Sequence, residues 1–278
     1  MIIKELIEYG KNNLINKEEP IRLSKMLLKY LLQVDDTYIV INNDKDILEE
    51  NVTKYKEYIN LLNQGIPIQY ITNNQEFMKL NFYVDKNVLI PQQDTEILVQ
   101  EVISILSKKN DIKVLDLCTG SGVIGISLAK YIEKSHVVMT DVSINALEIA
   151  KKNAINNEVN DKCKFVLSNM FENILDKFDV IVSNPPYIKS EVIKSLSKEV
   201  QNEPKIALDG GDDGLEFYKI IAKNAANFLS QYGFLALEIR FDQKDKVIDI
   251  LKKEKKYTNI YCKKDLSGND RVIICNLK

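Results

Sequence analysis

Apolar segments of strand length and of helix length alternate from about residue 113 to the C-terminus, and this alternation limits the possible folds most strongly. Parallel neighbours in a sheet need a long crossover, usually a helix, so the pattern predicts an α/β fold with a doubly wound, mostly parallel seven-stranded sheet. The last two strands flank the turn Ser267-Gly268-Asn269 and would form an antiparallel edge. The expected strands are 113–118, 136–140, 164–168, 178–183, 234–240, 258–262 and 271–276. The expected helices are 96–108, capped by Thr95, and 123–132, 145–156, 215–230 and 243–255.

The residues before this region have a different pattern. Apolar residues recur at helical spacing near the N-terminus, behind Pro20, and from Asp46 to Asn63, where Gly65 would end the helix. Short apolar runs then follow, with Asp85-Lys86-Asn87 as turn residues. We therefore predict three parts: a small helical-bundle domain over 1–74, a β-hairpin linker over 75–91, and the sheet domain over 92–278.

Charge and cysteine usage narrow the functional classes. The net charge of the 278-residue chain is −2, so no global basic field attracts nucleic acid. No apolar run is long enough to span a membrane, and the four scattered cysteines favour a cytoplasmic protein with reduced thiols. The one histidine, His136, is expected to be structural on a buried strand. Neither a Ser-His-Asp triad nor a metal site is therefore expected.

The loop after the first strand of the sheet has the composition of a nucleotide-binding turn. It consists of Cys118, Thr119, Gly120, Ser121 and Gly122. Ligands of open α/β sheets lie beyond the carboxyl ends of the strands, where the glycines would admit a ligand close to the backbone. The loop has no Lys or Arg, so the expected ligand is an adenosine without a pyrophosphate, such as S-adenosylmethionine. NAD and a plain tight turn remain open alternatives.

Two further strand ends supply candidate cofactor contacts. Asp141 closes the second strand, where its carboxylate can accept hydrogen bonds from both ribose hydroxyls. After the third strand, Asn169 could bind the adenine edge and Met170 could pack on its face, although Met170 also suits a hydrophobic core.

The tetrapeptide Asn184-Pro185-Pro186-Tyr187 follows the apolar strand 178–183. The residue before a proline is held in an extended conformation, and proline keeps its carbonyl while lacking an N–H. The Asn184 side-chain oxygen and the Pro185 carbonyl could therefore both accept from one planar –NH₂ group, with Tyr187 as a flat wall. A simple proline-rich turn is the alternative.

Together these segments resemble the peptide chain release factor glutamine methyltransferases, the HemK/PrmC family of class I S-adenosylmethionine-dependent methyltransferases. The resemblance runs from about residue 20 to the C-terminus. The matching segments are Pro67-Ile68-Gln69-Tyr70-Ile71, Gln75-Glu76-Phe77, Phe82-Tyr83-Val84, Val88-Leu89-Ile90-Pro91, Asp94-Thr95-Glu96, Asn184-Pro185-Pro186-Tyr187-Ile188, Glu203-Pro204, Ala207-Leu208, Gly210-Gly211, Asp213-Gly214-Leu215, Tyr218, Leu237-Glu238-Ile239 and Asp270-Arg271.

The resemblance implies methylation of the side-chain amide nitrogen, N5, of the glutamine in the Gly-Gly-Gln motif of release factors, in translation termination. It implies that a monomer binds S-adenosylmethionine and releases S-adenosylhomocysteine. It places the cofactor against 118–122, Asp141, Met170 and Asn184, and the glutamine against 184–187. The helical domain would recognise the release factor, without direct nucleic-acid or membrane binding.

The chain departs from the family pattern at four positions, which are Gln92, Cys118, Asn169 and Arg240. Gln92 stands where the family usually has Arg, and Cys118 replaces a glycine, which is tolerable where that position does not need a positive φ. Two other functions stay open. A nucleic-acid amino-methyltransferase acting on adenine or cytosine would use the same tetrapeptide, but it needs a flipped base and a basic surface. The second alternative is a non-enzymatic cofactor-binding protein.

Overall fold

The computed structural model describes residues 1–15, 17–107 and 109–278, which form two compact units. One unit comprises 1–73 together with 197–202, and the other comprises 74–196 and 203–278. The chain therefore passes from the second unit into the first and back again after residue 196.

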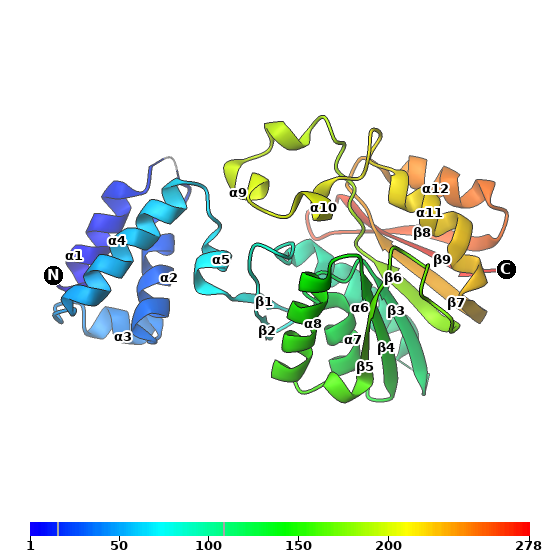
Figure 1. Cartoon of the computed structure of the whole chain (residues 1–278), viewed down its shortest axis with the longest axis horizontal. Helices are drawn as coiled ribbons and strands as arrows, with labels where there is room; N and C mark the ends of the chain where they lie inside the picture. The colour runs from blue at the N-terminus through cyan, green and yellow to red at the C-terminus, as the bar shows by residue number, and fades with distance from the viewer. Residues whose placement is uncertain (16, 108) are drawn as a thin grey trace. The chain divides into compact units, whose positions relative to one another are not determined.

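The first unit is helical (Figure 1). Its helices are α1 Ile3–Asn13, α2 Pro20–Leu32, α3 Asp36–Ile41, α4 Glu49–Asn63, α5 Ile68–Thr72 and α9 Lys198–Gln201. Pro20 opens α2, as the sequence predicts, because its missing N–H is not needed in a first turn. The short helix α3 is not predicted by periodicity, and its start is capped by Asp35, which accepts from the Tyr38 N–H at 2.7 Å.

Gly65 follows the end of α4 with a φ of +89°, which confirms its predicted role as the terminator of that helix. It also allows a close approach. A Cβ atom at this position would lie 2.6 Å from the Cβ of Lys198, and the Asn202 amide donates to the Gly65 carbonyl at 3.0 Å. Within the same unit, Lys17 pairs with Glu199. The segment 197–202 is thus bound to the helical unit.

The second unit contains a seven-stranded sheet with the strand order β5-β4-β3-β6-β7-β9-β8, in which only β9 is antiparallel to its neighbours (Figure 1). This confirms the predicted doubly wound sheet with an antiparallel edge. The strands are β3 Ile112–Leu117, β4 Ser135–Asp141, β5 Cys163–Leu167, β6 Phe178–Ser183, β7 Leu229–Glu238, β8 Tyr257–Lys264 and β9 Asp270–Leu277.

Helices cover both faces of this sheet because alternate strand residues enter two separate cores. Val114 belongs to the core beneath α6 Glu96–Leu106, α7 Val123–Tyr131 and α8 Ile144–Asn156. Leu115, on the opposite side of the strand, belongs to the core beneath α11 Glu216–Asn224 and α12 Lys244–Lys253. In the described part of the chain, no helix combines the length and apolar character needed to cross a membrane.

The predicted helix 215–230 and the following strand have different bounds in the structure. Helix α11 ends at Asn224, and β7 already begins at Leu229. The pairing between β6 and β7 is irregular near Gly233, where Tyr232 has a φ of +64°. Such a bulge breaks the alternation of apolar residues that marks a strand in sequence, so only the regular half of β7 was predicted.

The hairpin is shorter than predicted and turns elsewhere. Strands β1 Gln75–Phe77 and β2 Leu80–Phe82 are joined by Met78 and Lys79, which both have positive φ. The predicted turn at 85–87 exists, but 88–90 form no strand. Helix α6 is followed by Ser107, and its predicted end at Lys108 lies outside the described residues.

Two side-chain predictions were wrong. His136 lies on β4 but its side chain is 67% exposed, 3.5 Å from the Asp111 carboxylate, because β4 buries only its alternate residues at this end. Thr95 makes no capping hydrogen bond to α6, since a short 3-10 turn over Gln93–Thr95 precedes the helix. Its hydroxyl group is used elsewhere, as described below.

Candidate active site

The strand register brings four separate loops to one edge of the sheet. Leu117 at the end of β3 pairs with Thr140 on one side and Ser183 on the other, and Asp141 pairs with Leu167. The carboxyl ends of β3, β4, β5 and β6 are therefore level. Strand β3 is also where the order of the sheet reverses, which is the usual position of a ligand crevice in such folds.

A cavity that is open to solvent lies at this edge. It is lined by six of the predicted site residues, namely Cys118, Gly120, Asp141, Met170, Asn184 and Pro186, and also by Asn169. Further lining comes from the segment 87–89, from 204, 206 and 207, and from Phe217. Thr119, Ser121, Gly122, Pro185 and Tyr187 were also predicted to bind ligand, but they do not line it.

The loop 118–122 is anchored from below by a buried acid. Asp116 on β3 accepts from the Thr119 hydroxyl at 2.6 Å and from the Gly125 N–H at 3.0 Å. Burial raises the pKa of Asp116 to about 7, and these hydrogen bonds oppose that rise. Ser121 is buried, and its carbonyl accepts from Asn153 at 2.9 Å. Thr119 and Ser121 therefore shape the loop from behind and do not face the cavity.

Asp141 joins two walls of the cavity. One carboxylate oxygen accepts from the Gly120 N–H at 2.9 Å and the other accepts from the Ser143 N–H at 2.9 Å. Each oxygen of a carboxylate has two acceptor positions, so one remains on each oxygen. Burial raises the pKa of this carboxyl group, while the backbone hydrogen bonds lower it. Gly120 has a φ of +54° and open space where a Cβ would stand, which suits a ligand lying against its backbone.

Cys118 adopts the left-handed conformation, with a φ of +58°. The condition under which cysteine would be tolerated here without strain, a position that does not need a positive φ, is therefore not met. Its Sγ lies 3.8 Å from the Sδ of Met170, which also has a positive φ of 50°. Burial raises the pKa of the Cys118 thiol to about 12, so this cysteine is a packing residue and not a thiolate nucleophile.

Because the left-handed region costs a non-glycine residue on the order of 1 kcal/mol, substitutions at Cys118 should separate by backbone type. We expect Cys118→Gly to change the free energy of unfolding by less than about 1 kcal/mol, since relief of strain offsets the lost contact with Met170. Cys118→Val should destabilise by about 1–3 kcal/mol, because β-branching disfavours this conformation further. Urea unfolding of both variants tests this, and equal midpoints would contradict it.

The tetrapeptide 184–187 is held by contacts on both sides. Asn184 lines the cavity, and its amide nitrogen donates to the Thr95 hydroxyl at 3.3 Å. The Tyr187 carbonyl accepts from Gln243 at 3.0 Å. A Cβ on Gly210 would lie 2.7 Å from the Tyr187 Cα, so only glycine allows this packing. The Tyr187 side chain packs on the core beneath α11 and α12.

Directly after the tetrapeptide, the chain makes a long excursion that is closed at its base. The Ile188 N–H donates to the Leu208 carbonyl at 3.0 Å, and the Gly210 N–H donates to the Ile188 carbonyl at 2.8 Å. On the returning side, Glu203 accepts from the Ile90 N–H at 2.8 Å. Burial raises the pKa of Glu203 to about 7. The return passes through Pro204, Ile206 and Ala207 and completes the cavity wall.

The charges around the cavity are uneven. Among its lining residues in the described part of the chain, Asp141 is the one acid, and none is Lys or Arg. Gln92 stands where the family usually has Arg, and its side-chain amide N–H donates to the Ile90 carbonyl at 3.1 Å. Arg240 lies 3.3 Å from Asp242 and stacks near Phe241. In the same described ranges, no group of three or more His, Cys, Asp or Glu side chains could hold a metal.

Thr95 and Glu238 were not predicted as site residues. Glu238 is buried, with 1% exposure, at the carboxyl end of β7. The sequence did contain a signal for it, because an acidic residue ends the apolar run Leu235-Ala236-Leu237 and is followed by Ile239. Acids in such strands are rarely buried without a partner. Thr95 gave no comparable signal, since its position before a helix was explained by capping.

Comparisons with known proteins agree with this architecture. The model of the PrmC N-terminal domain matches residues 5–72, and that of the methyltransferase small domain matches residues 92–212. The release factor glutamine methyltransferase of Clostridium acetobutylicum is 40% identical over 90% of this chain and 89% of its own length. That of Clostridium botulinum is 41% identical with the same coverage. A ribosomal protein L11 methylase structure from Lactobacillus delbrueckii subsp. bulgaricus superimposes with a TM-score of 0.52 at 19% identity, covering 70% of this chain and 84% of that chain.

The match to the methyltransferase small domain model, on a sheet of this topology, shows that the second unit is a methyltransferase domain. The domain matches and the identity over most of the chain show more. The chain belongs to the release factor glutamine methyltransferase family.

Proposed function

We propose that the cavity binds S-adenosylmethionine and that the chain transfers its methyl group to the side-chain amide nitrogen of a glutamine. The observation that carries the cofactor assignment is the charge of the cavity, where Asp141 is the one charged group among the described lining residues. A dinucleotide or nucleoside phosphate would find no cation there, whereas a phosphate-free adenosine with a positive sulfonium fits.

The donor set of the cavity fits the same ligand. Asp141 retains one acceptor position on each carboxylate oxygen for the ribose hydroxyls, and Gly120 leaves its side of the cavity open. Asn169 and Met170 lie on the lining where an adenine ring can be bound by its edge and covered on its face. The bound cofactor would supply an activated methyl group.

The acceptor end of the reaction depends on this chain's own polar groups. An amide nitrogen is a weak nucleophile, since its lone pair is delocalised, so placement and charge stabilisation are the main requirements. We infer that the Asn184 Oδ1 and the Pro185 carbonyl each accept one hydrogen of the glutamine –NH₂ group. These two acceptors would stabilise the positive charge that develops on the nitrogen, which then loses one proton to water as S-adenosylhomocysteine is released. No step in this scheme requires a histidine.

We further propose that the substrate glutamine lies in the Gly-Gly-Gln motif of peptide chain release factors, and that the reaction serves translation termination. The names of the Clostridium relatives support this substrate class. The helical unit, which matches the PrmC N-terminal domain model, is the proposed recognition domain for the release factor.

The direct test locates the transferred methyl group. The purified chain is incubated with methyl-labelled S-adenosylmethionine and with either a release factor or duplex DNA, and the products are analysed by mass spectrometry. We expect a gain of one methyl group on the Gly-Gly-Gln glutamine. A matched release factor with that glutamine replaced by alanine should remain unlabelled. Label on DNA, or on neither substrate, would overturn the proposal.

A further inference from the structure

A small network of buried polar side chains lies behind Asn184, on the side away from the cavity. It consists of Thr95 and Glu238, which are 2% and 1% exposed. They come from distant parts of the sequence. Thr95 precedes α6, and Glu238 ends β7, next to the strand that leads into Asn184. The Thr95–Glu238 network takes no direct part in the proposed contacts to cofactor or glutamine.

The polar groups in this network differ in whether they donate or accept hydrogen bonds. The Asn184 Nδ2 lies 3.3 Å from the Thr95 Oγ1. The polar side chains of both Thr95 and Asn184 lie near the Glu238 carboxyl group and lower its pKa. A hydroxyl group can accept one hydrogen bond while it donates another, whereas an ionised carboxylate can only accept.

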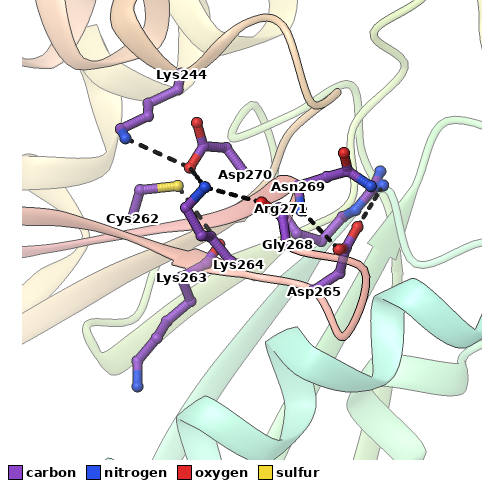
Figure 2. Close-up of polar contacts among 9 residues, drawn as sticks. All are labelled: Lys244, Cys262, Lys263, Lys264, Asp265, Gly268, Asn269, Asp270 and Arg271. Carbon is purple, nitrogen blue, oxygen red and sulfur yellow. Dashed lines mark hydrogen bonds and ion pairs between the residues drawn. The ribbon is translucent and has the colours of Figure 1, made fainter.

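Arg271, near the tip of the β8–β9 hairpin, favours the charged form of Glu238. Figure 2 shows the tip of this hairpin. The turn is closed by Asp265, whose carboxylate accepts from the Asn269 N–H at 2.8 Å and from the Arg271 guanidinium at 3.0 Å (Figure 2). The same guanidinium lies 2.9 Å from Asp94. The positive charge of Arg271 lowers the pKa of Glu238, and Asp94 raises it.

Glu238 and Arg271 each have a buried polar atom that lacks a hydrogen-bond partner among the described residues. These atoms are the Glu238 Oε2 and the Arg271 Nε. A buried carboxylate oxygen without a partner is costly, so burial of an acid here, beside a site residue, points to a function beyond packing.

We propose that Glu238 is a positioning residue that, through Thr95, holds the Asn184 amide with its nitrogen inward and its oxygen toward the substrate. The inference rests on the proposed function, because it concerns the acceptor of the glutamine –NH₂ group. The acceptor-only carboxylate makes the Thr95 hydroxyl donate inward. The lone pairs of that hydroxyl then remain for the Asn184 N–H, and Oδ1 is left for the cavity.

Protonation of Glu238 would remove the requirement that the Thr95 hydroxyl donates toward the carboxyl group. A protonated carboxyl group can donate to Thr95, whose hydroxyl can then donate to the Asn184 oxygen and reverse the amide. Burial raises the pKa of Glu238 to about 7, so the directing carboxylate is lost as the pH falls through that region. The charged or titratable groups that face Glu238 are Arg271, Asp94, Tyr187 and Tyr218. The pKa values of both tyrosines are raised, so both stay neutral in this range.

The first test uses paired variants at Thr95 in the full chain. Thr95→Val removes the hydroxyl at nearly constant volume, and Thr95→Ser keeps it. We expect kcat/KM for release factor methylation to fall at least roughly tenfold in Thr95→Val and to stay within about threefold of wild type in Thr95→Ser. S-adenosylhomocysteine affinity, measured by calorimetry, should change little in either, since Thr95 does not line the cavity.

The second test is the pH profile. Wild-type kcat/KM should rise with pH through the region near 7, and Glu238→Gln should lose this dependence and have low activity throughout, because its amide can donate to Thr95. Thr95→Ser should keep the wild-type profile. Asp116 and Glu203 also have pKa values near 7, so only a change in the profile of the Glu238 variant assigns the dependence to Glu238.

Tyr218→Phe is the matched control for a purely structural effect. The Tyr218 hydroxyl donates to the Glu238 backbone carbonyl at 2.9 Å and is equally buried, but it does not touch the carboxylate chain. We expect it to lower stability while the pH profile stays that of wild type. Wild-type rates in both Thr95→Val and Glu238→Gln would overturn the positioning role. Failure of the proposed function is distinct, because wild type itself would then not methylate release factor.

Discussion

Asn184→Ala is expected to reduce release factor methylation by at least about 10²–10³-fold, the loss typical when one preorganised group that stabilises a transition-state charge is removed. The substitution removes the Oδ1 that we assign to the glutamine –NH₂ group. Only a weak hydrogen bond to Thr95 is lost from the fold. Single-turnover kinetics with saturating cofactor should therefore show the defect in the chemical step.

A matched control for this variant is Asn169→Ala, which truncates the other asparagine that lines the cavity. Asn169 is exposed and donates to Glu172 at 3.0 Å, and we assign it to the adenine. Its removal should weaken cofactor binding several-fold and leave turnover at saturating cofactor near wild type. Near-normal turnover of Asn184→Ala, or equal defects in the two variants, would refute the role of Asn184.

Asp141→Ala should weaken S-adenosylmethionine binding by about 10–100-fold, the equivalent of about 1.5–3 kcal/mol for hydrogen bonds to a charged group. The carboxylate is the proposed partner of the ribose hydroxyls and also fixes the Gly120 and Ser143 N–H groups. Isothermal titration calorimetry with the cofactor measures the loss directly. Unchanged affinity would contradict the ribose assignment.

Asp213→Ala controls for the local backbone effect of that substitution. Asp213 accepts from the N–H two residues later, that of Leu215, at 3.0 Å, as Asp141 does from Ser143. It pairs with Lys219 outside the cavity. Its removal should leave cofactor affinity within about twofold of wild type, so a comparable loss in both variants would indicate a general loosening of loops.

The sheet was predictable because its strands are apolar runs of strand length and most of the parallel ones alternate with helices. Asp141 and Asn184 were predictable for a related reason. Both follow such strands directly, and carboxyl ends of parallel strands meet at one edge. In β7, by contrast, the first half has a bulge at Tyr232 and Gly233; its first two residues were assigned to the helix 215–230, and 231–233 were assigned to no element. Local periodicity fails where the backbone itself departs from regularity.

The rest of the site depends on contacts between residues far apart in the chain. Thr95 and Glu238 lie near Asn184 only because β7 pairs with β6 and the residue before α6 contacts Asn184. The positive φ of Cys118 is equally invisible in sequence, since cysteine gives no sign of a left-handed backbone. Such features are set by tertiary packing, which single-chain patterns do not encode.

The division of the chain at residues 196 and 202 has a consequence for how this protein can be taken apart. The helical unit includes residues 197–202, which lie in sequence between the tetrapeptide 184–187 and the cavity wall at Pro204. The two units are therefore joined by three covalent passages, not one. Removing residues 1–73 would leave Lys198 and Asn202 without Gly65 and would loosen the excursion that carries the wall. The helical unit therefore cannot be separated from the sheet unit by a single cut in the chain.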